Sequence, residues 1–160
     1  MVATFAEIAR THRLQEEAFA RHQEALLAGD LGAARRWLDR VAEHLRAHAA
    51  LEERHLQPIY ERGDAPRGGD PALFPGEHCK VERFLARLDA GLAAVAGPRD
   101  RIALFDVETH FKGLLEHHFG REEDLYFPQI QRLATEAERR AALDAFAAEE
   151  ERLRAWLGAG

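Results

Sequence analysis

The chain has 160 residues, of which 46% are hydrophobic and 31% are charged. This length and composition favour one globular domain over residues 1–160, with a sizeable core and no room for a second domain. The formal net charge is −6. It argues against a general nucleic-acid-binding surface, because such a surface needs clustered Lys and Arg to displace counterions from phosphates. We therefore expect no nucleic-acid partner.

The sequence carries no signal for secretion or for insertion into a membrane. Its N-terminus lacks a basic segment followed by an apolar one, and no stretch approaches the roughly 18 apolar residues of a membrane-spanning helix. The only cysteine, Cys79, cannot form an internal disulfide, and we expect it to be a small buried apolar residue beside His78. These features predict a cytoplasmic protein without a membrane partner.

The first half of the chain predicts two helices joined by a short turn. Thr4 and Glu7 form a capping-box pair that opens the first helix, and apolar residues then recur at helical spacing. Gly29 and Asp30 interrupt this pattern. Asp30 is a suitable N-cap for a second helix, which the apolar stripe extends to about Tyr60.

The second half predicts another pair of helices. Residues 61–76 are rich in glycine and proline and predict an irregular surface loop between the two halves. A third helix then carries His78 on its apolar face and ends at the Gly-Pro dipeptide at residues 97–98. A fourth helix is expected from about Arg99 to the neighbourhood of Pro128.

A fifth helix is predicted at residues 135–157, where Thr135 and Glu138 form another capping box. One face of this helix is apolar and the other is densely charged, so we expect it to pack on its own bundle. Its apolar residues are Leu143, Phe146, Leu153 and Leu157. No β pattern of any length is present. The predicted fold is therefore all-α, an antiparallel four-helix up-down bundle over about residues 5–133 with an additional C-terminal helix.

One motif, with a histidine, two glutamates and a proline, occurs twice at the same spacing. The first copy consists of His48, Glu52, Glu53 and Pro58, and the second of His118, Glu122, Glu123 and Pro128. A histidine and a glutamate four residues apart lie on one face of a helix, so both side chains can reach one ion. A single pair of this kind is most often a solvated surface contact. Two copies on apolar stripes indicate a shared internal site.

The predicted hairpins also bring four histidines to one level. In an antiparallel hairpin, residues equally far from the turn face each other. The pairs that meet this condition are His12 with His48 about Asp30, and His78 with His118 about Pro98. Buried imidazoles and carboxylates without partners would cost several kcal/mol, for which a metal ion compensates. The predicted metal ligands are His12, His48, Glu52, His78, His118 and Glu122.

Four further residues are candidates for additional ligands or for hydrogen-bond partners of the ligands. They are Glu16, His44, Glu82 and Glu123. His44 lies level with Glu16 in the first hairpin, and we favour a role for it beside the ligands rather than on the metal. A solvated helix face is an equally good interpretation of Glu16 and Glu82. Four histidines are too far along a helix or rotated off the stripe to reach the site, namely His22, His55, His110 and His117.

Taken together, these motifs resemble the hemerythrin-like, HHE cation-binding family, over about residues 5–133 and without the fifth helix. The resemblance implies a four-helix bundle that holds a non-haem di-iron centre, with glutamates bridging the ions and O₂ or nitric oxide able to reach one iron. Four imidazoles and two carboxylates suit iron, and they also suit Mn or Zn. Irving–Williams affinity even favours zinc over iron, so the metal in a purified sample depends on availability.

Two departures from the family's oxygen carriers argue against simple oxygen carriage. Those proteins have two histidines four residues apart on the third helix, whereas Phe74 and Glu82 lie four residues from His78 here. They also have an aspartate five residues after the histidine of the fourth helix, where this chain has Glu123 in addition to Glu122. The pattern is more similar to family members linked with iron handling, with oxygen or nitric oxide sensing, or with iron–sulfur repair.

Three functional hypotheses follow from the sequence. The leading one is a metal-binding protein that responds to O₂ or nitric oxide or handles iron. The second is a redox enzyme at the same di-iron centre, acting in nitric oxide or peroxide detoxification or in iron–sulfur repair. The third is a metal-free helical interaction module. Metal content, substrate turnover and an unchanged melting temperature on chelation separate the three.

Overall fold

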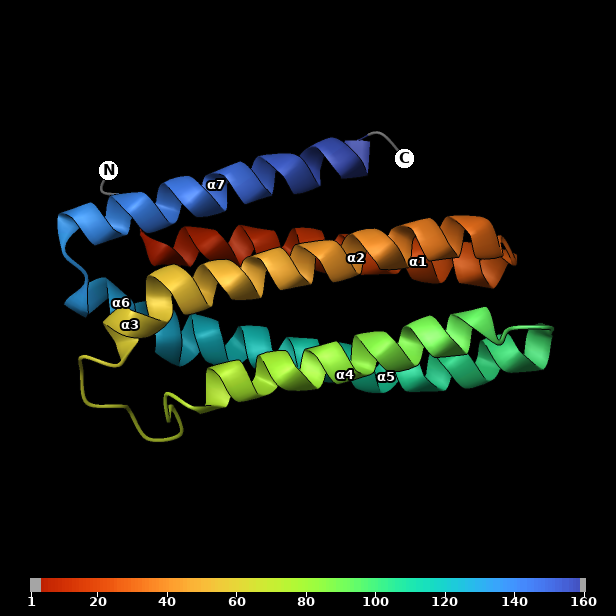
Figure 1. The fold of residues 1–160 in the computed structure, drawn as a ribbon, viewed down its shortest axis with the longest axis horizontal. Helices are drawn as coiled ribbons and strands as arrows, with labels where there is room; N and C mark the ends of the chain where they lie inside the picture. The colour runs from red at the N-terminus through yellow and green to blue at the C-terminus, as the bar shows by residue number, and fades with distance from the viewer. Residues whose placement is uncertain (1–3, 159–160) are drawn as a thin grey trace.

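The computed structural model describes residues 4–158, and this part of the chain is helical with no strand. Two long antiparallel hairpins pack side by side, and a further helix lies along one of them (Figure 1). The elements are a 3-10 helix at Phe5–Ile8, α1 (Ala9–Ala28), α2 (Leu31–Leu51), a π-helical turn at Glu52–Leu56, α3 (Gln57–Tyr60), α4 (Leu73–Ala93), α5 (Pro98–Arg121), a second π-helical turn at Glu122–Tyr126, α6 (Phe127–Leu133) and α7 (Glu136–Gly158). The predicted all-α bundle with an additional C-terminal helix is confirmed.

The turn between α1 and α2 forms where the sequence predicts it. Gly29 has a φ of 78°, in the left-handed region that glycine adopts without steric cost, and it ends α1. Asp30 caps α2, because its Oδ1 accepts a hydrogen bond of 2.8 Å from the N–H of Ala33. The turn of the first hairpin is therefore fixed by two adjacent residues, the glycine that ends α1 and the aspartate that caps α2.

The second hairpin begins earlier than the glycine and proline content suggests. We expected residues 61–76 to be a loop, but α4 already begins at Leu73. Pro75 lies in the first turn of α4, where the N–H that proline lacks would have no helical partner. Between α4 and α5, the carboxylate of Asp100 accepts hydrogen bonds of 2.9 Å from two consecutive backbone N–H groups.

We expect two continuous helices for the repeated motif from the sequence, but in the structure both are interrupted. Each contains a π-helical turn that begins at the motif's first glutamate, Glu52 or Glu122. Pro58 and Pro128 each lie just beyond their turn. A proline ring clashes with the carbonyl four residues before it in an α-helix, and here that carbonyl falls inside the wider π-helical turn. We attribute both interruptions to these prolines.

The apolar core consists of two clusters with a polar layer between them. The larger cluster lies toward the two hairpin turns and includes Leu38, Leu88 and Phe111. The smaller lies at the opposite end and includes Phe5 and Ile130. The buried side chains of this polar layer lie at the boundary between the two clusters, and they are His12, His48, Glu52, His78, His118 and Glu122.

The additional helix, α7, packs on α1 and α2 (Figure 1). The predicted capping box opens it, since Thr135 donates its N–H to Glu138 over 2.8 Å. Phe146 and Leu153 are buried against the bundle. No helix among residues 4–158 has an apolar stretch long enough to cross a bilayer.

Candidate metal centre

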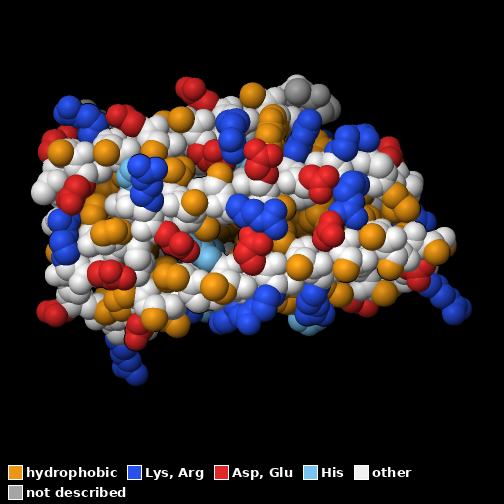
Figure 2. All heavy atoms as spheres, in the orientation of Figure 1, with side chains coloured by type: hydrophobic (Ala, Val, Ile, Leu, Met, Phe, Trp, Pro, Cys, Tyr) orange, Lys and Arg blue, Asp and Glu red, His pale blue; other side chains and the backbone are white. Residues whose placement is uncertain are grey.

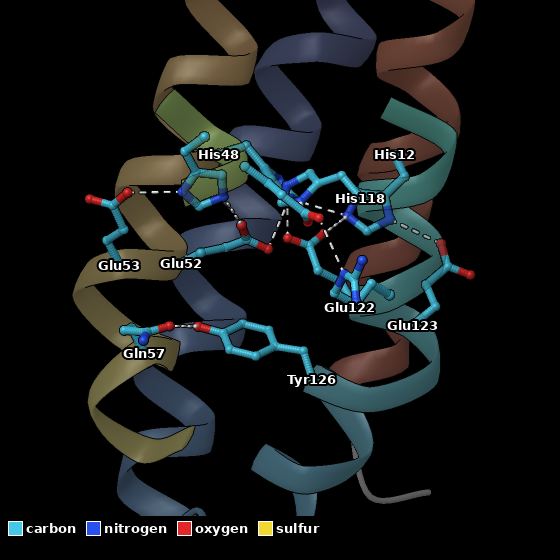
Figure 3. A network of polar contacts seen from close by, with 12 residues as sticks. His12, His48, Glu52, Glu53, Gln57, His118, Glu122, Glu123 and Tyr126 are labelled. Carbon is cyan, nitrogen blue, oxygen red and sulfur yellow. Dashed lines mark hydrogen bonds and ion pairs between the residues drawn. The ribbon is translucent and has the colours of Figure 1, made fainter. Parts of the chain in front are cut away.

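The six side chains predicted as metal ligands lie together in the polar layer, and none of them is more than 9% exposed. They form two groups of four, and within each group one ligand atom per residue lies within 4.8 Å of the others. The first group is His12, His48, Glu52 and Glu122, and the second is Glu52, His78, His118 and Glu122. Both carboxylates belong to both groups. The close-up of the layer shows them between the helices (Figure 3).

Each of the four long helices of the bundle contributes to the layer. The four histidines come one each from α1, α2, α4 and α5. The two shared carboxylates come from the first residues of the two π-helical turns. Such turns are rare overall, and they occur frequently at functional sites.

Three of the four imidazoles are held by a carboxylate at Nδ1. His12 lies 3.0 Å from Glu123, His78 lies 2.8 Å from Glu53, and His118 lies 3.0 Å from Glu77. Each is a carboxylate–imidazole contact of the kind that fixes the orientation of the ring. An Nδ1–H donated in this way leaves the Nε2 lone pair free to bind a metal. The fourth imidazole, His48, has no partner at its buried Nδ1.

The Nε2 atoms converge on the shared carboxylates and on one another. His12 and His48 approach through their Nε2 atoms at 3.2 Å. The Glu122 oxygens lie 3.2 Å from His12 Nε2 and 2.9 Å from His118 Nε2, yet neither contact has the alignment of a hydrogen bond. Glu52 lies 3.2 Å from the Nε2 atom of His48.

This arrangement fits a metal ion better than it fits hydrogen bonding alone. Both Glu122 oxygens and Oε1 of Glu52 are buried without a hydrogen-bond partner. Imidazole lone pairs and carboxylate oxygens that face each other repel unless a cation or a proton lies between them. A buried carboxylate without compensation is costly, so the donor set and its unpaired oxygens match the requirements of a metal site.

The same convergence changes the proton affinity of the metal-free imidazoles. Burial lowers the pKa of both His12 and His118, but nearby carboxylates outweigh this effect. Glu122 and Glu123 raise the pKa of His12 to about 9. Glu122 and Glu77 raise the pKa of His118 to about 10. The pKa of Glu52 is held well below its usual range because neighbouring imidazoles outweigh the effect of its burial.

Metal binding is therefore expected to release protons. Below their raised pKa values, His12 and His118 hold protons that a metal ion must displace, so about two protons per chain should be released at pH 7.5. Apparent metal affinity should rise with pH until about 9 to 10. An indicator dye in weak buffer during a Zn²⁺ titration measures the release. Binding without proton release at pH 7.5 would contradict this prediction.

Two carboxylates that contact the ligands were not predicted. In the sequence, Glu53 stands out only as part of the repeated motif, and Glu77 does not stand out at all. Glu77 is buried and also contacts Nε of Arg121 at 3.3 Å. The repetition of Glu-Glu in both motifs was a usable signal for Glu53. Nothing in the sequence distinguishes Glu77 from a surface glutamate.

His44 and Glu16, which the sequence places at the same level of the first hairpin, do not meet in the structure, and the solvated interpretation of Glu16 holds. Glu16 is exposed, and the neighbouring Gln15 takes the buried position on α1. His44 is fully buried, and its Nδ1 contacts Glu149 of α7 instead. A helix outside the four-helix bundle supplies this partner, which positions in the first hairpin cannot reveal.

Two residues near His78 face away from the metal ligands, as expected for one of them and against expectation for the other. Glu82 faces outward and forms two hydrogen bonds with Arg46 of α2, at 2.8 and 3.0 Å, so the solvated interpretation holds. The prediction that Cys79 is buried is wrong, because its side chain is exposed. Adjacent helical residues differ by about 100° in direction, so Cys79 does not share the inward direction of His78.

The histidines expected to lie elsewhere do so. His110 and His117 are exposed and His55 is half-buried. His22 is buried nearer the hairpin turn, where its Nε2 lies 2.8 Å from Glu108 and its Nδ1 donates to a backbone carbonyl at 2.8 Å. These contacts satisfy His22 without a metal.

A pocket of about 480 Å³ between α2 and α4 connects the polar layer with the surface. His48, His78 and His118 line it, together with Cys79. On the face that carries this pocket, imidazole atoms are visible at the bottom of a hollow (Figure 2). A small molecule can therefore approach the layer from this side.

Comparison with known protein families also indicates a metal-binding helical bundle. Residues 3–109, and again residues 72–159, match the hemerythrin HHE cation binding domain. The second match extends through α7, beyond the range over which the motifs resemble the family. Two overlapping matches are consistent with a repeated hairpin. Comparisons with curated proteins and with solved structures found no match. The buried His/Glu groups fit a metal-binding helical bundle, and the chain belongs to the hemerythrin HHE cation-binding domain family.

Proposed function

We propose that this protein holds a dinuclear iron centre and binds a small exogenous ligand such as O₂ or nitric oxide there, in sensing, ligand binding or iron handling. The observation that carries the proposal is the sharing of Glu52 and Glu122 by both four-residue groups. Two ions could each receive two imidazoles and share both carboxylates. One ion in the middle of the layer would not use all six side chains equally well.

The donor set supports iron as the metal. Imidazole nitrogen is a borderline donor and carboxylate oxygen is a hard one, and their combination suits iron and manganese as well as zinc. The single cysteine of the chain, Cys79, is exposed and offers no thiolate to the layer. Iron when bound would supply redox chemistry and coordination positions for a diatomic ligand.

The residues around the layer have separate tasks in this proposal. Glu53, Glu77 and Glu123 orient three of the imidazoles through Nδ1. Phe119 stacks on His12 with ring centroids 4.1 Å apart and excludes water from that side. The result is a dry, pre-oriented set of donors, open to solvent mainly through the pocket between α2 and α4.

Elemental analysis of protein loaded anaerobically with Fe²⁺ tests the proposal. We expect about two irons per chain, new absorption bands on addition of nitric oxide, and a lower melting temperature after chelation. An ion present at 1,000 times its Kd would stabilise the fold by about 4 kcal/mol. A chain without bound metal and with a melting temperature indifferent to chelators would support the helical interaction module instead.

A further inference from the structure

The pocket between α2 and α4 is larger than a diatomic ligand requires. Its volume of about 480 Å³ is more than ten times the roughly 30 Å³ that one water occupies in the liquid. It lies within the range of about 300–1,000 Å³ that is typical of sites for small organic molecules. The volume of the pocket is therefore sufficient for a small organic molecule that carries a metal-binding atom.

The walls of the pocket are mostly apolar, whereas its base and rim are polar. Leu45 and Ala49 of α2 face Val81 of α4 across it, and Phe119 of α5 adds an aromatic wall. The ion pair between Arg46 and Glu82 spans α2 and α4 at the surface. A ligand that fits this pocket therefore combines an apolar body, which contacts the walls, with one donor atom, which reaches the metal position at the base.

The pocket approaches the two proposed metal positions unequally. His78 and His118, which define one position, both line it, and His78 is the most exposed of the four imidazoles at 9%. His48 also lines the pocket, but His12 does not. The ring of Phe119 is in the pocket wall and is stacked on His12, so it screens the other position.

We propose that this pocket binds a small organic molecule with an apolar body and one oxygen, nitrogen or sulfur donor, which reaches the metal position between His78 and His118. The inference rests on the proposed dinuclear centre. It extends that function from a diatomic ligand to an organic one, which would be the substrate or the signal of the centre.

The single cysteine makes the inference testable. Cys79 is exposed and lines the pocket, so a thiol reagent modifies the chain at this one place. We would load the protein with Fe³⁺ and titrate it with phenol, which gives a visible absorption band when it binds iron(III), and with azide as a small ligand. Both titrations would then be repeated after labelling with benzyl methanethiosulfonate.

We expect phenol to bind to the unlabelled protein and the benzyl label to weaken phenol binding at least tenfold, while iron content stays unchanged and azide still binds. Ala49→Phe, which fills the pocket from α2 with the cysteine intact, should have the same effect. Two labelled controls should leave phenol binding unchanged. One is Cys79→Ser, and the other adds Ala20→Cys to it, in a separate pocket between α1 and α5.

The possible failures can be told apart. Azide binding without phenol binding, or phenol binding that neither the label nor Ala49→Phe weakens, would overturn the organic-ligand site and leave the proposed function standing. Low iron content together with no azide binding would overturn the dinuclear centre, and this inference with it.

Discussion

Replacing Glu52 or Glu122 with alanine is expected to reduce iron content from about two ions per chain to fewer than one. Each carboxylate belongs to both four-residue groups, so its removal takes a donor from both proposed metal positions at once. The remaining carboxylate cannot balance two ions in a layer where every ligand is buried. Elemental analysis after anaerobic loading, with melting curves before and after chelation, measures the effect.

Matched variants separate this role from a general effect of removing a glutamate. Glu82→Ala removes an exposed carboxylate near the pocket and should retain two ions. Glu53→Ala and Glu123→Ala remove a partner of an imidazole and not a proposed ligand, so metal affinity should fall by about 10–100-fold. If all five substitutions lowered metal content equally, the distinction between ligands and their partners would be wrong.

The positions of the helices could be predicted well from the sequence, because the signals that mark where a helix begins or ends are local. Asp30 and Thr135 both act as caps at the positions where their side chains suggested it. The π-helical turns escaped prediction, because an apolar stripe is assigned on a regular helix with 3.6 residues per turn, in which no extra residue is inserted. The prolines at 58 and 128 mark the places, although in a sequence a proline there indicates only that a helix is about to end.

The histidine layer could be predicted because it follows from the symmetry of two hairpins. Equal distance from a turn sets the height of a residue, and the repeated motif sets the face. The carboxylates that contact the imidazoles were harder to predict, since Glu77 and Glu149 reach across from other helices. Whether such a glutamate points inward depends on how the helices are rotated and docked, which the periodicity of one helix does not fix.

The layer is also less symmetric than the repeated motif. His118 is held at Nδ1 by Glu77, the residue just before His78. Thr11 stands just before His12, and its hydroxyl donates to the backbone carbonyl of Ile8 instead. His48 therefore lacks the carboxylate that its counterpart has. An imidazole backed by a carboxylate is the more basic donor, so the two proposed metal positions should differ in affinity.

Truncation of the chain after Ala134 is expected to lower the melting temperature strongly while metal content stays near that of the full chain. The lost helix, α7, buries Phe146 and Leu153 against α1 and α2, which contributes about 3–6 kcal/mol before the entropy of ordering is subtracted. For a chain of this size, such a loss corresponds to a fall on the order of 10 °C. All six proposed ligands precede the cut.

Point substitutions separate the packing of α7 from its mere presence. Phe146→Ala should destabilise the full chain by about 3–5 kcal/mol, because it leaves a cavity beside His48, whose ring lies 5.2 Å from that of Phe146. Ala148→Ser changes an exposed position of the same helix and should have little effect. Thermal melts measure the stability of the truncated chain and of the two point variants, and light scattering measures their oligomeric state. If the truncated chain melted like the full one and a dimer became a monomer, α7 would serve assembly between chains rather than the stability of its own bundle.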